Sequence, residues 1–199
     1  MESDVSDTSS TWRDHVVMWA KDASRAIDYV ESRPDLDHEG IAFYGVSWGA
    51  VMGSIIPAIE PRIRVSVLAL GGLDFHRSLP EVDAINFLPR IKQPTLMLNG
   101  KYDFFFPVQS TQDPFYQLLG AKHKKHLLYE SGHVIPRNEL IKETLNWLDE
   151  LCRASAMSPV LTSEGSLMMY ATRPRYYGEM GRGNLISPEI FRPSAEELR

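Results

Sequence analysis

Residues 41–49, Ile-Ala-Phe-Tyr-Gly-Val-Ser-Trp-Gly, are the stretch that decides the fold of this 199-residue chain. The first five residues are short, apolar and uninterrupted, which is typical of a strand buried in a parallel sheet. Residues 45–49 then have the Gly-x-Ser-x-Gly spacing of a sharp strand-to-helix turn, which exposes a serine hydroxyl on strained backbone. We expect Gly45 and Gly49 to be glycines because a side chain at either position would collide across the tight turn. A helix is predicted from about Trp48 to Ala58.

The segments on either side of this stretch alternate between helical and strand-like patterns. Before it, apolar residues recur at helical spacing from Val16 to Val30, with Thr11 as the expected N-cap and an end near Ser32. After it, apolar runs predict strands at 64–70, 94–100 and 125–129. Between these runs, helices are predicted near 82–88 and 107–119.

A last helix is expected to follow the fourth strand, with Asn138 as its cap. Its predicted buried stripe comprises Ile141, Thr144, Leu145 and Leu148. Because strands alternate with helices along the chain, the pattern predicts an α/β protein, with a mainly parallel sheet of about four strands flanked by helices.

The composition is that of an ordinary soluble globular protein. Hydrophobic residues make up 43% and charged residues 24%, and the formal net charge is −5, so we expect neither a nucleic-acid nor a membrane partner. A single cysteine, Cys152, allows no intrachain disulfide, and the acidic first ten residues do not resemble a secretory signal, so a cytoplasmic location is expected. We expect residues 1–10 to be disordered, residues 11–152 to form the folded domain and residues 153–199 to be a loosely ordered tail.

A serine hydroxyl is a weak nucleophile unless a base takes its proton, and the sequence offers a base and a carboxylate at suitable places. His133 follows the fourth predicted strand, and Asp103 follows the third. Catalytic groups in open parallel sheets lie beyond the carboxyl ends of the strands, so Ser47, Asp103 and His133 are the predicted nucleophile, acid and base. Asp74, which follows the second strand, is the main rival to Asp103, and Asp83 is a weaker one.

The segment from about Arg13 to Leu151 resembles the C-terminal half of α/β-hydrolases of the dienelactone-hydrolase and prolyl-oligopeptidase-like group. The resemblance rests on residues 45–49, on Leu-Asn-Gly-Lys-Tyr-Asp at 98–103 and on Ser-Gly-His at 131–133. It implies a serine hydrolase that cleaves an ester or amide bond of a small molecule or peptide through an acyl-enzyme, with the Trp48 amide donating to the oxyanion. This chemistry needs no cofactor, and no metal-ligand spacing appears among the six histidines.

The chain departs from the family pattern upstream of Ser47. The family places the nucleophile after the fifth strand of about eight, whereas here one helix precedes the nucleophile strand, so a partial α/β-hydrolase fold without the N-terminal strands is expected. The strand ending at Gly45 should then have an exposed edge, and the second oxyanion donor, which the family takes from the missing part, is not in this sequence. A homodimer or an upstream domain could complete the sheet. The alternative hypothesis is an inactive or truncated fragment that acts as a non-catalytic interaction module.

Aromatic residues near the predicted site allow two interpretations. Trp48, Phe75 and the Phe-Phe-Phe run at 104–106 could line an apolar pocket. The run could instead pack under the loop that carries Asp103, which is the commoner place for large apolar side chains.

Overall fold

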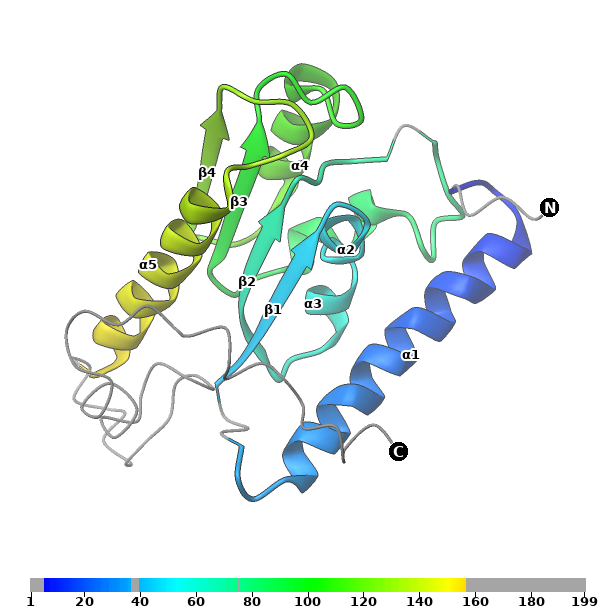
Figure 1. Cartoon of the computed structure of the whole chain (residues 1–199). Coiled ribbons are helices and arrows are strands. Elements are labelled where there is room, and N and C mark those ends of the chain that lie inside the picture. The colour runs from blue at the N-terminus through cyan, green and yellow to red at the C-terminus, as the bar shows by residue number, and fades with distance from the viewer. Residues whose placement is uncertain (1–5, 37–39, 75, 157–199) are drawn as a thin grey trace, which may run out of the picture.

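The strands of the computed structural model, which describes residues 6–36, 40–74 and 76–156, form one parallel sheet (Figure 1). They are β1 (Ile41–Val46), β2 (Ile63–Ala69), β3 (Thr95–Gly100) and β4 (Lys124–Tyr129), hydrogen-bonded in the order β1-β2-β3-β4. All three neighbouring pairs are parallel. The predicted α/β class, with a parallel sheet of four strands between helices, is confirmed.

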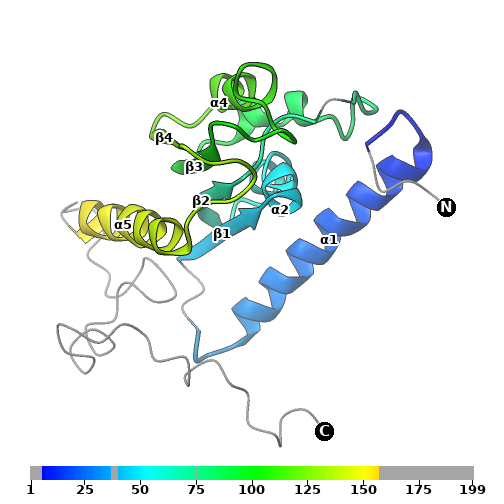
Figure 2. The ribbon, with the colours of Figure 1, turned by 45° about the horizontal axis from the view of Figure 1, so that its top comes forward.

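Helices cover both faces of this sheet (Figures 1 and 2). One face is covered by α5 (Arg137–Ala156), and the other by α2 (Trp48–Met52), α3 (Ile56–Ile59) and α4 (Asp113–Leu118). Beside β1 runs α1 (Ser10–Ser32), whose buried residues pack with those of α2 and α3. The arrangement is that of a layered α/β domain, in which loops at the carboxyl ends of the strands gather at one edge.

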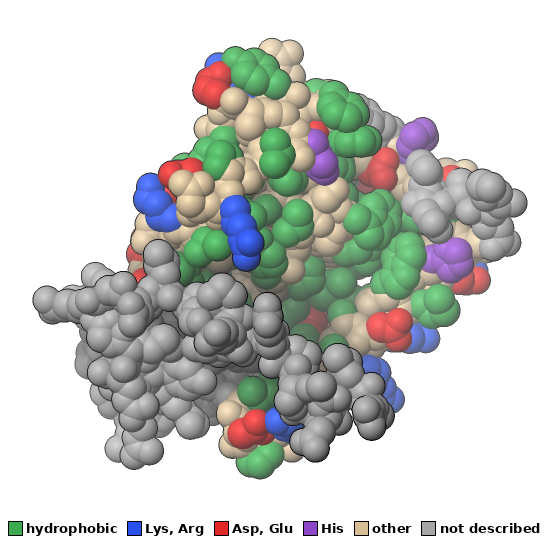
Figure 3. Space-filling model, viewed as in Figure 1, with side chains coloured by type: hydrophobic (Ala, Val, Ile, Leu, Met, Phe, Trp, Pro, Cys, Tyr) green, Lys and Arg blue, Asp and Glu red, His purple; other side chains and the backbone are tan. Residues whose placement is uncertain are grey.

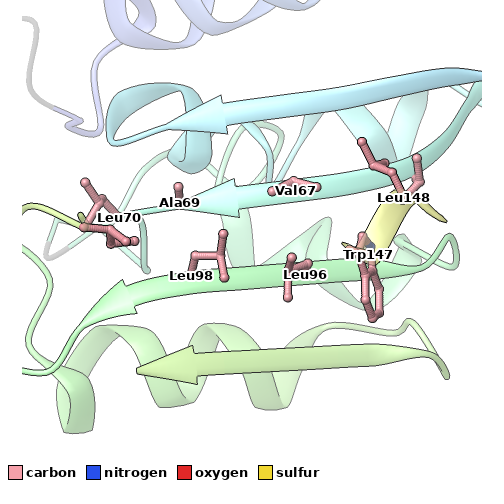
Figure 4. Packing of buried hydrophobic residues seen from close by; sticks show 9 residues of the cluster. Val67, Ala69, Leu70, Leu96, Leu98, Trp147 and Leu148 are labelled. Atoms are coloured by element: carbon pink, nitrogen blue, oxygen red, sulfur yellow. The ribbon is translucent and has the colours of Figure 1, made fainter. Parts of the chain in front are cut away.

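Buried side chains alternate between the two faces of the central strands, as the two-residue period of a strand requires. Val67 and Leu96 point toward α5 and pack with Trp147 and Leu148 (Figure 4). Leu68 points to the opposite face, where it packs with buried residues of α2, β3 and α4. These two layers fix the ends of the strands, and therefore the loops that follow them.

The N-terminal part of the fold begins earlier than the sequence predicted. Ser9, not Thr11, is the N-cap of α1, and its hydroxyl accepts a hydrogen bond from the Trp12 amide at 3.1 Å. Ser6 is buried, and the Asp7 carboxylate accepts a hydrogen bond from the Ser9 amide. The prediction of disorder is therefore wrong for residues 6–10, and residues 1–5 lie outside the described residues. The predicted end of the helix at Ser32 is confirmed.

The helix predicted from Trp48 to Ala58 is two short helices, α2 and α3, because residues 53–55 interrupt it. Pro57 has no N–H to donate to the carbonyl of Gly53, so the helical ladder cannot run through this point. Gly53 also lies directly against β2, where a Cβ would overlap the side chain of Leu68.

The helix predicted at 107–119 is likewise divided. It begins with a π-helical turn, η3 (Val108–Gln112), and continues as α4. Pro114 lacks the N–H that would bond the carbonyl of Ser110, so the ordinary helical ladder is interrupted where the π-helical turn meets α4. Two 3₁₀ turns, η1 (Ala84–Asn86) and η2 (Leu88–Arg90), stand where one short helix was predicted near 82–88.

The last helix also differs from its prediction. It starts at Arg137, because the Pro136 carbonyl accepts the Leu140 amide, so Asn138 lies inside the helix and is not its cap. Ile141 is exposed rather than buried, while Trp147 and Leu148 face the sheet. The helix continues to Ala156, past the predicted domain end at residue 152, and residues 157–199 of the predicted tail lie outside the described residues.

Within the described residues, β1 is an edge strand that pairs with β2 on one side. Tyr44 and Val46 are 49% and 41% exposed on the face of β1 that α5 leaves uncovered. Figure 3 views this face and shows hydrophobic side chains gathered over its middle. Among the described residues, β1 therefore has no strand on its other side, as the sequence predicted. No helix among the described residues is long and apolar enough to cross a membrane.

Candidate active site

Ser47 stands at the carboxyl end of β1 on strained backbone. Its φ of 52° and ψ of −111° lie in a region that non-glycine residues seldom adopt, at a cost of about 1–3 kcal/mol. The surroundings hold it there: the Ser47 amide donates to the Ala69 carbonyl at 2.8 Å, and the Ser47 carbonyl accepts the Ala50 and Val51 amides. The side chain is thereby presented beyond the sheet, at the start of α2.

The two glycines that flank this turn differ in the space that a side chain would have. A Cβ on Gly45 would overlap the Gly49 carbonyl and lie 2.8 Å from the Ala50 nitrogen, so a side chain is excluded there. A Cβ on Gly49 would meet no atom within 4 Å. The expectation of a steric collision is wrong for Gly49, because α2 turns its second residue outward from the turn.

The structure brings Ser47, His133 and Asp103 together in one hydrogen-bonded chain. Ser47 Oγ lies 2.9 Å from His133 Nε2, and His133 Nδ1 lies 2.7 Å from Asp103 Oδ2. A carboxylate can only accept, so Nδ1 carries the hydrogen and Nε2 presents its lone pair to the serine hydroxyl. The three residues follow β1, β4 and β3, whose carboxyl ends meet at one edge of the sheet.

Asp103 is buried, and its carboxylate is fully engaged. Besides the imidazole, it accepts the Phe105 amide at 2.9 Å and the Phe106 amide at 3.1 Å. These hydrogen bonds balance the burial of a charged group and fix the oxygen that faces His133.

The two rival aspartates are engaged elsewhere. Asp83 accepts the Ile85 amide and an Arg77 N–H, which makes it the cap of η1. Asp74 accepts the amide of His76. Among the three candidate carboxylates, Asp103 is the one that contacts His133.

Two residues that support this arrangement were not predicted from the sequence. The fully buried Gln112 donates from Nε2 to the Gly100 carbonyl at 3.0 Å and to the Phe106 carbonyl at 2.6 Å, which ties both ends of the Asp103 loop together. Gly100 lies under the His133 loop, where a Cβ would be 2.6 Å from the Ser131 carbonyl oxygen. In the sequence, the role of Gly100 was signalled only by a glycine directly before the segment that carries Asp103. No sequence pattern indicated the role of Gln112.

The loops that carry Asp103 and His133 are also joined at the surface. The Tyr102 amide donates to the Ser131 carbonyl at 2.9 Å. Glu130 accepts both the Lys101 ammonium at 2.7 Å and the Tyr102 hydroxyl at 2.6 Å, and this holds its pKa below the usual value. These contacts link the two loops to each other.

Trp48 occupies the first position of α2, directly after Ser47. Amides at the first positions of a helix have no intrahelical acceptor and favour negative charge, so the Trp48 N–H is available beside the serine oxygen. The Trp48 ring packs edge-on against the rings of Trp12 and Trp19, with centroids 5.5 and 5.9 Å away. This contact anchors the turn to α1.

The three phenylalanines at 104–106 do not all pack under the loop that carries Asp103. Phe106 is partly buried and lies against Gly72, as expected for packing under the loop. Phe104 and Phe105 are 73% and 52% exposed, so that expectation is wrong for them. Phe75 lies outside the described residues.

The opposite end of the sheet carries a depression of about 440 Å³, lined by residues that include Pro57, Ile63 and Arg90. It is remote from the chain of hydrogen bonds, because Ile63 starts β2 whereas Ser47 follows the end of β1. In the described part of the chain, no group of three or more His, Cys, Asp or Glu side chains is placed to hold a metal ion.

No protein-family model matches this chain, and no curated protein matches it. Solved structures do. A cold-adapted esterase from an Arctic intertidal metagenomic library aligns with a TM-score of 0.58 at 25% identity over 68% of this chain. An acetyl xylan esterase from Paenibacillus sp. R4 gives 0.55 at 24% over 64%, and a protein from Klebsiella pneumoniae subsp. pneumoniae named as a dienelactone hydrolase gives 0.58 at 19% over 66%.

The alignments cover 58%, 51% and 60% of those three proteins, so this chain spans less than two thirds of their length. This sheet and these likenesses show that the chain has an α/β-hydrolase fold.

Proposed function

We propose that the chain is a serine hydrolase that cleaves an ester or amide bond through an acyl-enzyme. One observation carries this proposal: the unbroken hydrogen-bond chain from Asp103 through His133 to Ser47 at the carboxyl edge of the sheet. The esterases among the structural neighbours favour an ester as the substrate. The reaction needs no cofactor.

Each residue has a distinct role in the proposed reaction. Ser47 Oγ attacks the carbonyl carbon while His133 Nε2 takes the hydroxyl proton, and Asp103 stabilises the resulting imidazolium without being protonated. The Trp48 N–H donates to the oxyanion that forms. His133 then gives the proton to the leaving group, and a water molecule, deprotonated by the same nitrogen, releases the acyl group from Ser47.

A second oxyanion donor completes such a site, and we propose that a partner supplies it along the open edge of β1. The partner is a second copy of this chain or an upstream domain. The exposed Tyr44 and Val46 beside that edge support this placement. One donor contributes on the order of 100- to 1000-fold in turnover. Activity per chain that rises with protein concentration, together with a dimer in size-exclusion chromatography, supports the homodimer; a monomer with constant specific activity contradicts it.

A cytoplasmic location remains our proposal. Its support is the single cysteine in 199 residues.

Ester turnover by the purified chain tests the proposed function. We expect hydrolysis of 4-nitrophenyl acetate by the wild type and its loss in Ser47→Ala. The matched control is Ser110→Ala, which removes an exposed hydroxyl of η3. A folded wild-type chain that hydrolyses no ester, or equal rates in Ser47→Ala and wild type, supports the non-catalytic module instead.

A further inference from the structure

Two phenylalanines stand exposed beside His133. The rings of Phe104 and Phe105 lie 4.1 Å apart between centroids, and the Phe105 ring meets the imidazole edge-on at 4.9 Å. Although both are large and apolar, they are 73% and 52% exposed. Exposed apolar groups that lie together next to reactive side chains commonly mark a binding surface.

Their exposure does not come from a loosely held loop. The Phe105 and Phe106 amides donate to Asp103 Oδ1, and Gln112 donates to the Phe106 carbonyl. The backbone of this short segment is therefore fixed by the same bonds that orient the acid. The two rings are therefore solvent-exposed on a fixed backbone beside His133.

The chemistry of His133 decides which part of a substrate these rings would touch. Nε2 must return its proton to the leaving group, so the leaving group has to come within hydrogen-bond distance of that nitrogen. The acyl group instead stays on Ser47, near the Trp48 amide. A ring in contact with the imidazole therefore borders the leaving-group side of the site.

The charges near these rings are already paired. Lys101 and Glu130 form an ion pair at 2.7 Å, and the Tyr102 hydroxyl donates to the same carboxylate. The described neighbourhood thus offers apolar ring faces rather than an unpaired charge to a bound group.

We propose that Phe104 and Phe105 form the leaving-group subsite and select esters of apolar, ring-bearing alcohols over esters of small alcohols. This inference rests on the proposed function and names its substrate class. Aromatic pairs stabilise beyond the area that they bury, so the subsite is worth about tenfold in kcat/KM.

A matched pair of substrates tests the subsite: 2-phenylethyl acetate and ethyl acetate share the acyl group and have leaving alcohols of similar acidity. We expect kcat/KM for the phenylethyl ester to exceed that for the ethyl ester by about tenfold or more. The ratio should fall toward one in Phe105→Ala and in Phe104→Ala. Phe105→Tyr should retain it, and so should Tyr29→Ala, which removes an exposed aromatic ring at the far end of α1.

Binding supplies a second readout that needs no turnover. We expect 2-phenylethanol, but not ethanol at the same concentration, to slow the labelling of Ser47 by a fluorophosphonate, and the protection to be lost in Phe105→Ala. Equal hydrolysis of the two esters, without protection, overturns the subsite and leaves the proposed function intact. Absence of both labelling and hydrolysis overturns both.

Discussion

Gly45 and Gly49 flank the same serine, yet alanine should destabilise the fold at Gly45 and should not destabilise it at Gly49. In Gly45→Ala the new methyl overlaps the Gly49 carbonyl and lies 2.8 Å from the Ala50 nitrogen. These atoms are the backbone of α2, which cannot rotate away as a side chain does. We therefore expect a loss of about 3 kcal/mol in the free energy of unfolding, at the upper end of the usual cost of overpacking.

In Gly49→Ala the methyl meets no atom within 4 Å, and the backbone there is helical. Because glycine in a helix is less favourable than alanine by about 0.5–1 kcal/mol, this variant should be as stable as the wild type or more stable by up to that amount.

Urea denaturation followed by circular dichroism measures both changes. With a slope of about 2 kcal/mol per molar urea, Gly45→Ala should lower the midpoint by about 1.5 M, and Gly49→Ala should leave it unchanged or raise it by up to about 0.5 M. Labelling of Ser47 by a fluorophosphonate should survive in Gly49→Ala. Our account of the turn is refuted if Gly45→Ala has the wild-type midpoint, or if Gly49→Ala is the more destabilised of the two.

Three further predictions follow from the contacts around the site and the sheet. Asp103→Asn should keep the fold but lower kcat about 10⁴-fold, because the imidazole of His133 loses the tautomer that can accept the serine proton. The control Asp74→Asn should retain turnover. Steady-state kinetics with a nitrophenyl ester measure both variants. Gln112→Leu should cost about 1–3 kcal/mol in urea denaturation, because the Gly100 and Phe106 carbonyls lose the buried amide that ties them together. A wild-type midpoint would contradict this. Hydrogen bonds from Arg62 lower the pKa of Glu60 below its usual 4.5, so this pair stabilises the fold above that pH and the contribution is lost as the pH falls through the lowered pKa. Arg62→Ala should therefore lose more stability at pH 7 than at pH 3, and equal losses would contradict the assignment.

Sequence patterns located the strands well, because buried parallel strands are short uninterrupted apolar runs. Each of the four observed strands starts and ends within one residue of its predicted bounds. The strands also placed Ser47, Asp103 and His133 at one edge, since parallel strands bring their carboxyl ends together.

What the sequence did not predict depended on contacts across the fold. Gln112 has its role because the π-helical turn orients its buried side-chain amide toward carbonyls of a different loop. No local sequence pattern predicts that orientation. Gly49 was misjudged because the direction of its missing side chain depends on how α2 leaves the turn. Ser9 and Thr11 are both good caps by residue type, and the packing of Trp12 against α2 and α3 decided between them.

The role of Ser47 as a nucleophile activated by His133 is tested by intact-mass analysis and peptide mapping after treatment with a fluorophosphonate. We expect one adduct per chain, located on Ser47, with no adduct in Ser47→Ala and much slower formation in His133→Gln. An adduct on another residue, or an unchanged rate in His133→Gln, would contradict the proposed chemistry.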